Sequence, residues 1–95
     1  MNNSPREREV EALLVKRVQA AGGQAYKFTS PGRVGVPDRI VLLPWREPVF
    51  VEVKRKGMVP RPSQVREHQR MRAAGATVVV IDDAAGISAL LEERE

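Results

Sequence analysis

The run from Asp38 to Leu43, DRIVLL, constrains the fold of this chain more than any other feature, because it is apolar on both faces of a strand. Successive side chains of an extended chain point to opposite sides, so Ile40 and Leu42 share one face and the residue after each of them lies on the other. A strand of this kind is stable only where other elements cover both faces. We therefore expect residues 38–43 to form a central strand of a sheet that is covered on both sides.

The rest of the chain divides into six further elements, separated by turn-forming residues. Helical spacing of apolar residues from Val10 to Ala21 ends at Gly22 and Gly23, which break a helix. We predict helices over residues 5–21, 62–74 and 83–93, and strands over residues 24–28, 38–43, 49–54 and 77–81. The order α-β-β-β-α-β-α indicates an α/β fold with a mixed central sheet flanked by helices, in a single domain of residues 1–95.

Length and composition limit the classes of protein to which the chain can belong. A chain of 95 residues forms one modest core and gains stability from association with a second copy. It has no Cys and a single His, which excludes disulfides and zinc sites built from Cys and His. Its apolar runs are too short for export or for crossing a bilayer, so we expect a cytoplasmic protein with no membrane partner.

The charge of the chain favours an anionic partner. Sixteen Lys and Arg residues against twelve Asp and Glu residues give a net charge of +4, and nearly all the basic residues lie between Arg6 and Arg72. Phosphates neutralised by Lys and Arg release counterions, which supplies affinity for nucleic acid of any sequence. Charge alone leaves an ordinary solvated cationic surface as the alternative.

Two carboxylates and one ammonium group are predicted to meet at one end of the sheet. If the hairpin folds symmetrically about Trp45, Asp38 faces Glu52 across the two strands. The two-residue period of a strand then puts Lys54 on the same face as Glu52. Charges buried in an otherwise apolar sheet are costly unless something compensates them. A divalent cation is the natural compensation, and Mg²⁺ takes one or two carboxylates together with waters and substrate phosphate.

These groups predict hydrolysis of a phosphodiester without a covalent intermediate. Mg²⁺ held by Asp38 and Glu52, with the Val53 carbonyl as a further ligand, would polarise the phosphodiester and lower the pKa of a bound water. Lys54 would orient that water or help to deprotonate it, and would neutralise charge that builds on the phosphoryl group.

The residues PD at positions 37–38 and EVK at positions 52–54 resemble the PD-(D/E)-x-K signature of a nuclease superfamily. The longer pattern GVPDRIVLLP...VFVEVK...Q resembles the stand-alone bacterial and phage type of VRR-NUC domain (virus-type replication-repair nuclease), from about Glu9 to Ile81. The resemblance implies a restriction-endonuclease-like core and a metal-dependent DNA endonuclease, with Mg²⁺ as cofactor and Mn²⁺ able to substitute. Compact members of this type resemble Holliday junction resolvases, which implies a homodimer and structure-selective cleavage of branched DNA in repair.

The family pattern also places an acidic residue of the first helix at the metal. Glu7, Glu9 and Glu11 compete for this role. Glu11 is preferred and Glu9 comes second, because Glu11 lies eleven residues before Gly22, a spacing similar to that in archaeal Holliday junction resolvases. For Glu7 and Glu9 an ordinary role is the stronger interpretation, since acids in a first turn complement the helix dipole.

Two residues of the helix over residues 62–74 bear on the same site. Gln64 matches the Gln of the family pattern, which implies a contact with the scissile phosphate or with the attacking water; without the resemblance it would be an ordinary solvated Gln. His68 lies one turn later and could serve as a general base, but Lys54 already fills that role in this arrangement. We therefore expect His68 at the surface or half-packed.

Seven basic or polar side chains are expected to position a DNA duplex through phosphate contacts, without reading bases. They surround the two loops at the metal: Lys27, Ser30, Arg33, Arg39, Lys56, Arg61 and Arg66. Trp45 is left without an assigned role. It could stack on a base, or it could pack against its own hairpin or a partner subunit. The alternatives are a flap or nicking nuclease, a non-catalytic module that binds nucleic acid on the same fold, and a structural domain with an alternating VEVK strand.

Overall fold

The computed structural model describes residues 4–92, and over them the order of helices and strands is the one predicted from the sequence. The elements are α1 (Ser4–Ala20), β1 (Gln24–Lys27), β2 (Arg39–Leu43), β3 (Arg46–Val53), α2 (Pro62–Ala73), β4 (Thr77–Ile81) and α3 (Ala84–Leu90). None of the helices in this part of the chain has the length and apolar character needed to span a membrane. The last residue of the helix predicted to end at Glu93 lies outside the described residues.

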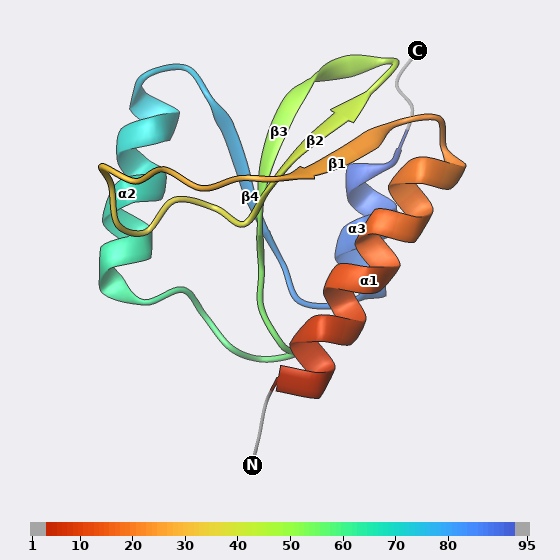
Figure 1. Cartoon of the computed structure of the whole chain (residues 1–95), viewed down its shortest axis with the longest axis horizontal. Coiled ribbons are helices and arrows are strands. Elements are labelled where there is room, and N and C mark those ends of the chain that lie inside the picture. The colour runs from red at the N-terminus through yellow and green to blue at the C-terminus, as the bar shows by residue number, and fades with distance from the viewer. Residues whose placement is uncertain (1–3, 93–95) are drawn as a thin grey trace.

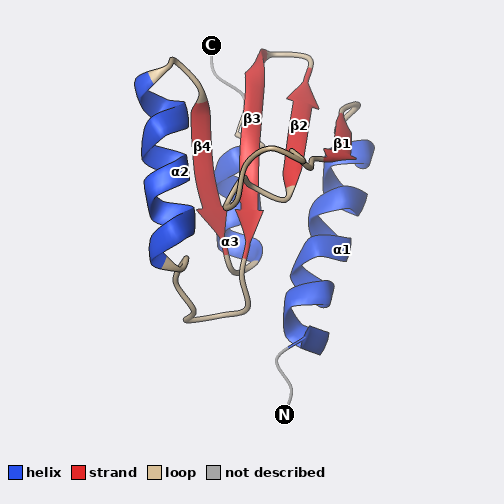
Figure 2. Ribbon diagram, turned by 60° about the vertical axis from the view of Figure 1, so that its left-hand side comes forward, coloured by secondary structure: helices blue, strands red, loops and turns tan. Residues whose placement is uncertain are grey.

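The four strands form one mixed sheet in the order β1-β2-β3-β4 (Figure 2). β2 pairs antiparallel with β1 and with β3, whereas β4 lies parallel to β3. A parallel pair needs a long crossover connection, and α2 supplies it between β3 and β4. β2 is therefore an internal strand, as its apolar sequence predicts.

The helices divide between the two faces of the sheet, with α1 and α3 on one side and α2 on the other (Figure 1). The main core lies on the α1 and α3 side. It is built from alternate residues of the strands and from the inner faces of the two helices: Leu14, Val18, Val41, Leu43, Val49, Val51, Val53, Ile81, Ile87 and Leu90. Each such side chain contributes about 1.5–3 kcal/mol by leaving water.

The second face of β2 is only partly covered, so the prediction of full cover on both sides is wrong. Leu42 is 36% exposed, and Tyr26 of the neighbouring strand, on the same face, is 55% exposed. α2 packs against β4 rather than over this half of the sheet. The reason is the connection: α2 joins β3 to β4 and stays above that pair of strands.

β3 begins at Arg46, three residues before the predicted start at Val49. Pro48 suggests a loop because it has no N–H to donate to a neighbouring strand. In the structure the pairing between β2 and β3 shifts register between Val41 and Leu43, opposite this part of β3. A proline is tolerated at such an irregularity, because no regular ladder hydrogen bond is lost there.

The loop between β1 and β2 is closed at its base and packed against the start of α2. The Phe28 N–H donates to the carbonyl of Asp38 at 2.9 Å, which brings the two ends of the loop together. Gly35 has a φ of +90°, and a Cβ at this position would lie only 2.7 Å from the Ser63 carbonyl oxygen. The close approach of Gly35 to α2 thus fixes where the chain enters Asp38.

Gly35→Ala is expected to lower the free energy of unfolding by about 2 kcal/mol or more, because the new Cβ collides with backbone at a strained φ. Gly32→Ala in the same loop is the matched control, since a Cβ there meets nothing within 4 Å. It should change stability by less than about 0.5 kcal/mol. Urea denaturation of both variants measures the difference, and equal stabilities would contradict the packing of this loop on α2.

Candidate active site

Asp38 and Glu52 lie side by side at the end of the β2–β3 hairpin. The register pairs Arg39 with Val51, and one further step along both strands sets Asp38 opposite Glu52, as the symmetric hairpin predicts. Oδ2 of Asp38 accepts a hydrogen bond of 2.8 Å from the backbone N–H of Val53. This bond holds the Asp38 carboxylate across the strand pair, beside the second acid.

The carboxylate of Glu52 is buried, at 2% exposure. Its Oε2 accepts a hydrogen bond of 2.9 Å from Nε2 of Gln64 and lies 3.6 Å from Nζ of Lys54. Its Oε1 has no hydrogen-bond partner among the described residues and lies 3.7 Å from Nε2 of His68. Asp38, Glu52, Lys54 and Gln64, which the sequence analysis placed at one site, therefore do come together.

The electrostatics of this cluster are unfavourable to a charged Glu52. Burial raises the pKa of Glu52 to about 7, and the negative charge of Asp38 adds to the increase. The ammonium group of Lys54 acts in the opposite direction and lowers this pKa. The burial of Glu52 and the charge of Asp38 raise this pKa more than Lys54 lowers it. An additional cation bound at the site would therefore stabilise the ionised Glu52 carboxylate.

His68 is almost fully buried, at 1% exposure, so the expectation of a surface or half-packed side chain is wrong. Burial lowers the pKa of His68, and the positive charge of Arg72 lowers it further, so the imidazole is neutral at pH 7. The sequence contained a signal for the burial of His68. Residues four apart share one face of a helix, and His68 follows Gln64 by four positions. Both side chains point from α2 toward Glu52.

Gln64 is fully engaged inside the protein. Its Nε2 donates to Glu52, and its Oε1 accepts a hydrogen bond of 2.8 Å from the backbone N–H of Arg61. The same side chain therefore holds the buried carboxylate and caps the first turn of α2. The predicted contact of Gln64 with a phosphate or a water would require Gln64 to release Glu52.

The three acidic residues of α1 that compete for a place at the site lie in different environments. Glu11 accepts a hydrogen bond of 2.9 Å from Nε of Arg39 and lies 3.7 Å from Nζ of Lys27. The acid of α1 whose charge raises the pKa of Glu52 is Glu7. The structure thus places Glu11 in an ion-pair network with two basic residues, and Glu9, the second choice, is exposed.

The seven predicted DNA contacts fall into different environments. Arg39 is only 15% exposed and binds Glu11 and the Ala25 carbonyl, so a phosphate contact would require it to leave these partners. Arg33 pairs with Glu67 at 3.2 Å, and Lys56 pairs with Asp83. The remaining side chains lie at the surface or close to it: Lys27, Ser30, Arg61 and Arg66.

The residues present at the site fit a divalent cation supplied with waters and phosphate. Within residues 4–92 no three acidic or histidine side chains form a ready-made cage for a metal ion. Two carboxylates do stand together, and one of them has a buried oxygen without a hydrogen-bond partner. Mg²⁺ needs no more than one or two carboxylates from the protein.

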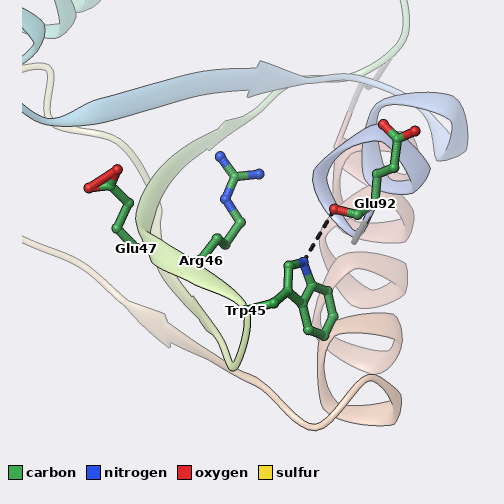
Figure 3. A pocket seen from close by; sticks show the side chains of 4 residues that line it. All are labelled: Trp45, Arg46, Glu47 and Glu92. Carbon is green, nitrogen blue, oxygen red and sulfur yellow. Dashed lines mark hydrogen bonds between the residues drawn. The ribbon is translucent and has the colours of Figure 1, made fainter. Parts of the chain in front are cut away.

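A hollow of about 380 Å³ lies at the opposite end of the hairpin and has no part in this chemistry (Figure 3). It is lined by Trp45, Arg46, Glu47 and Glu92. The indole N–H of Trp45 donates to the Glu92 carbonyl at 3.2 Å, and Arg46 donates to the Leu90 carbonyl at 3.3 Å. Trp45 therefore packs against the end of α3 of its own chain, which gives it a structural role.

Comparison with known proteins identifies the family. The chain is 53% identical over 77 residues to the protein named "Putative nuclease p44" of Acyrthosiphon pisum secondary endosymbiont phage 1, an overlap of 81% of this chain and 83% of that protein. A solved structure of a VRR_NUC domain superposes with a TM-score of 0.84 and 37% identity, over 95% of this chain and 98% of that one. The chain belongs to the VRR-NUC family.

The fold of this VRR-NUC protein is accordingly the restriction-endonuclease-like fold that the sequence pattern implied. A scan against family models gives no match. Membership therefore rests on the two relatives, one similar in sequence and one in three-dimensional structure.

Proposed function

We propose that this VRR-NUC protein is a Mg²⁺-dependent endonuclease that hydrolyses phosphodiester bonds in branched DNA, as Holliday junction resolvases do. The names of the two relatives support nuclease activity. The observation that carries the metal-dependent chemistry is the pair of adjoining carboxylates, Asp38 and the buried Glu52, beside Lys54. A module that only binds DNA has no use for two carboxylates at the point where phosphates approach.

Asp38 and Glu52 would hold Mg²⁺, with the Val53 carbonyl as a further ligand and Mn²⁺ as a substitute. When bound, the cation polarises the scissile phosphodiester and lowers the pKa of a water. For the acid of α1 we now favour Glu7 over Glu11, because the charge of Glu7 acts on Glu52 whereas Glu11 is paired with Arg39.

Lys54 is placed to act on the reacting groups. Its Nζ lies 3.6 Å from Oε2 of Glu52, which holds the ammonium group beside the proposed metal site. The side chain is 14% exposed, so the ammonium group can still contact a bound substrate. There it orients the attacking water and offsets negative charge on the phosphoryl group. Gln64 keeps Oε2 of Glu52 in place, and contacts the phosphate or the water only if it leaves that oxygen.

The DNA duplex would be held by basic side chains on the loops around the site. Lys27 and Lys56 are 72% and 61% exposed, and Arg61 and Arg66 are exposed as well. Ser30 and Arg33 lie on the loop that leads to Asp38, and Arg33 would exchange its partner Glu67 for a phosphate. Such contacts position the DNA backbone without selecting a sequence.

A homodimer would give the two symmetric cuts that resolution of a four-way junction needs. The open half of the sheet offers a self-complementary patch, because Tyr26 and Leu42 are exposed on the face that also carries Glu52. The Trp45 turn is less suited to this role than the sequence suggested, since its indole is bound to α3.

Incubation of the purified protein with labelled linear, flap and four-way-junction DNA tests the proposal. We expect cleavage with Mg²⁺ or Mn²⁺ and none with a chelator, together with paired cuts on the four-way junction and a dimeric mass in light scattering. Single nicks by a monomer would identify a flap or nicking nuclease. Binding without cleavage under every metal condition would identify a non-catalytic module.

A further inference from the structure

Two buried polar atoms without hydrogen-bond partners face each other beneath the candidate site. Oε1 of Glu52 and Nε2 of His68 are 3.7 Å apart, and neither has a hydrogen-bond partner in the described part of the chain. The two residues are 2% and 1% exposed, so neither side chain is open to bulk solvent. Unpartnered buried polar atoms are costly, whereas one hydrogen bond between these two would satisfy both.

The inner face of α2 is polar, which is unusual for a helix packed on a sheet. Its buried residues are Gln64, Glu67 and His68. A helix that served only the core would bury an apolar stripe instead. Glu67 has a structural partner in Arg33 of the preceding loop, and Gln64 has one in Glu52. His68 shares a helix face with Gln64 and is aimed at the same carboxylate.

We propose that His68 is a positioning residue that holds Oε1 of Glu52, while Gln64 holds Oε2. The Nε2–H of His68 donates to the ionised carboxylate after a small rotation that shortens the 3.7 Å separation to hydrogen-bond length. Two donors from one helix then fix the carboxylate plane, and its remaining lone pairs keep a constant direction for the cation. This inference rests on the proposed function, because it takes Glu52 as a metal ligand.

Core packing alone explains why His68 is buried, but it does not explain why Nε2 of the imidazole is directed at Glu52. An imidazole that only filled space would place its polar nitrogen toward a permanent partner or toward solvent. Nε2 of His68 instead points at the one oxygen of Glu52 that neither Gln64 nor Lys54 occupies. The role needs only a hydrogen on Nε2, which the neutral imidazole and the imidazolium can both carry.

Calorimetric titration of the free protein with Mg²⁺, without DNA, separates positioning from packing. His68→Leu removes the donor and is expected to weaken Mg²⁺ binding by about 10- to 100-fold, the usual effect of losing a residue that orients a metal ligand. His68→Gln keeps an amide N–H at a similar reach and should stay within about threefold of wild type. Gln69→Leu, at an exposed position of the same helix, is the control and should bind as wild type does.

The outcomes distinguish this inference from the proposed function. If the wild-type protein takes up no Mg²⁺, or Asp38→Ala binds it equally well, the metal site itself is wrong. If wild type binds and Asp38→Ala does not, but His68→Leu binds as wild type, only the role of His68 fails. Equal weakening by His68→Leu and His68→Gln, with equal losses in melting temperature, would show that His68 acts through shape alone.

A nuclear magnetic resonance spectrum of the imidazole nitrogens gives a second readout that needs no variant of His68. In the metal-free wild-type protein at pH 8, where Glu52 is ionised, we expect the hydrogen on Nε2, and we expect Glu52→Gln to shift the Nε2 resonance. Glu47→Gln, at an exposed position of the same strand, should leave that resonance unchanged. A hydrogen carried on Nδ1 alone, or a resonance that ignores Glu52→Gln, would overturn the inference.

Discussion

Glu52→Gln is expected to reduce DNA cleavage by several orders of magnitude while DNA binding persists. The substitution keeps the shape of a side chain that is 2% exposed, and its amide oxygen can still accept the hydrogen bond from Gln64. It removes the negative charge that a divalent cation needs, and with it the activation of water that metal-dependent hydrolysis requires. Binding should stay or tighten, because one negative charge is lost where phosphates approach.

Single-turnover cleavage and fluorescence anisotropy on the same four-way junction measure the two quantities separately. Glu47→Gln is the matched control, since Glu47 lies near the other end of β3 and is exposed. It should cleave and bind as wild type does. Cleavage by Glu52→Gln at close to the wild-type rate would remove Glu52 from the mechanism.

The parts of the fold that follow local periodicity could be predicted from the sequence. Alternation along residues 38–43 and 49–54 gives both strands and groups the residues that share a face, such as Val41 and Leu43. The register also follows, because a short hairpin centred on Trp45 leaves little freedom in pairing. These same features set Asp38, Glu52 and Lys54 together, so the centre of the site is contained in one hairpin.

The position of α2 could not be predicted in the same way. Its sequence has no apolar stripe that would point to a particular face of the sheet, and its inward residues are polar. A polar helix is ordinarily solvated, which led to the wrong expectation for His68. The exposure of Leu42 could not be predicted for the same reason, because the cover of that face of the sheet depends on where α2 packs.

The role of each acid of α1 could not be decided from spacing alone. Spacing from Gly22 favoured Glu11, but spacing along a helix does not say which side of a sheet its residues meet. Arg39 pairs with Val51, whose side chain lies in the core under α1, so Arg39 is on the α1 side and binds Glu11 there. Glu52 is the next residue of β3 and points to the opposite face, and the acid of α1 whose charge acts on it is Glu7, one turn nearer the start of the helix.

The buried carboxylate at the site should make stability depend on pH in the absence of metal. We expect the free energy of unfolding of wild type to fall relative to that of Glu52→Gln as the pH rises from about 4.5 to about 7. In this window the folded protein retains a proton on Glu52 that the unfolded chain releases, because the pKa rises from 4.5 to about 7 on folding. The state that binds more protons loses stability as the pH rises.

The shift corresponds to about 3 kcal/mol, so at pH 8 the Gln variant should be the more stable protein by about that amount, whereas below pH 4.5 the two should be nearly equal. Urea denaturation from pH 4 to pH 8 in a chelator measures the gap. His68 titrates in the opposite sense, because a lowered pKa costs stability as the pH falls below 6.5. Saturating Mg²⁺ should narrow the gap at pH 8, since it binds the folded wild type alone. A gap that does not change between pH 4 and pH 8 would show that Glu52 is ionised as easily in the folded protein as in water.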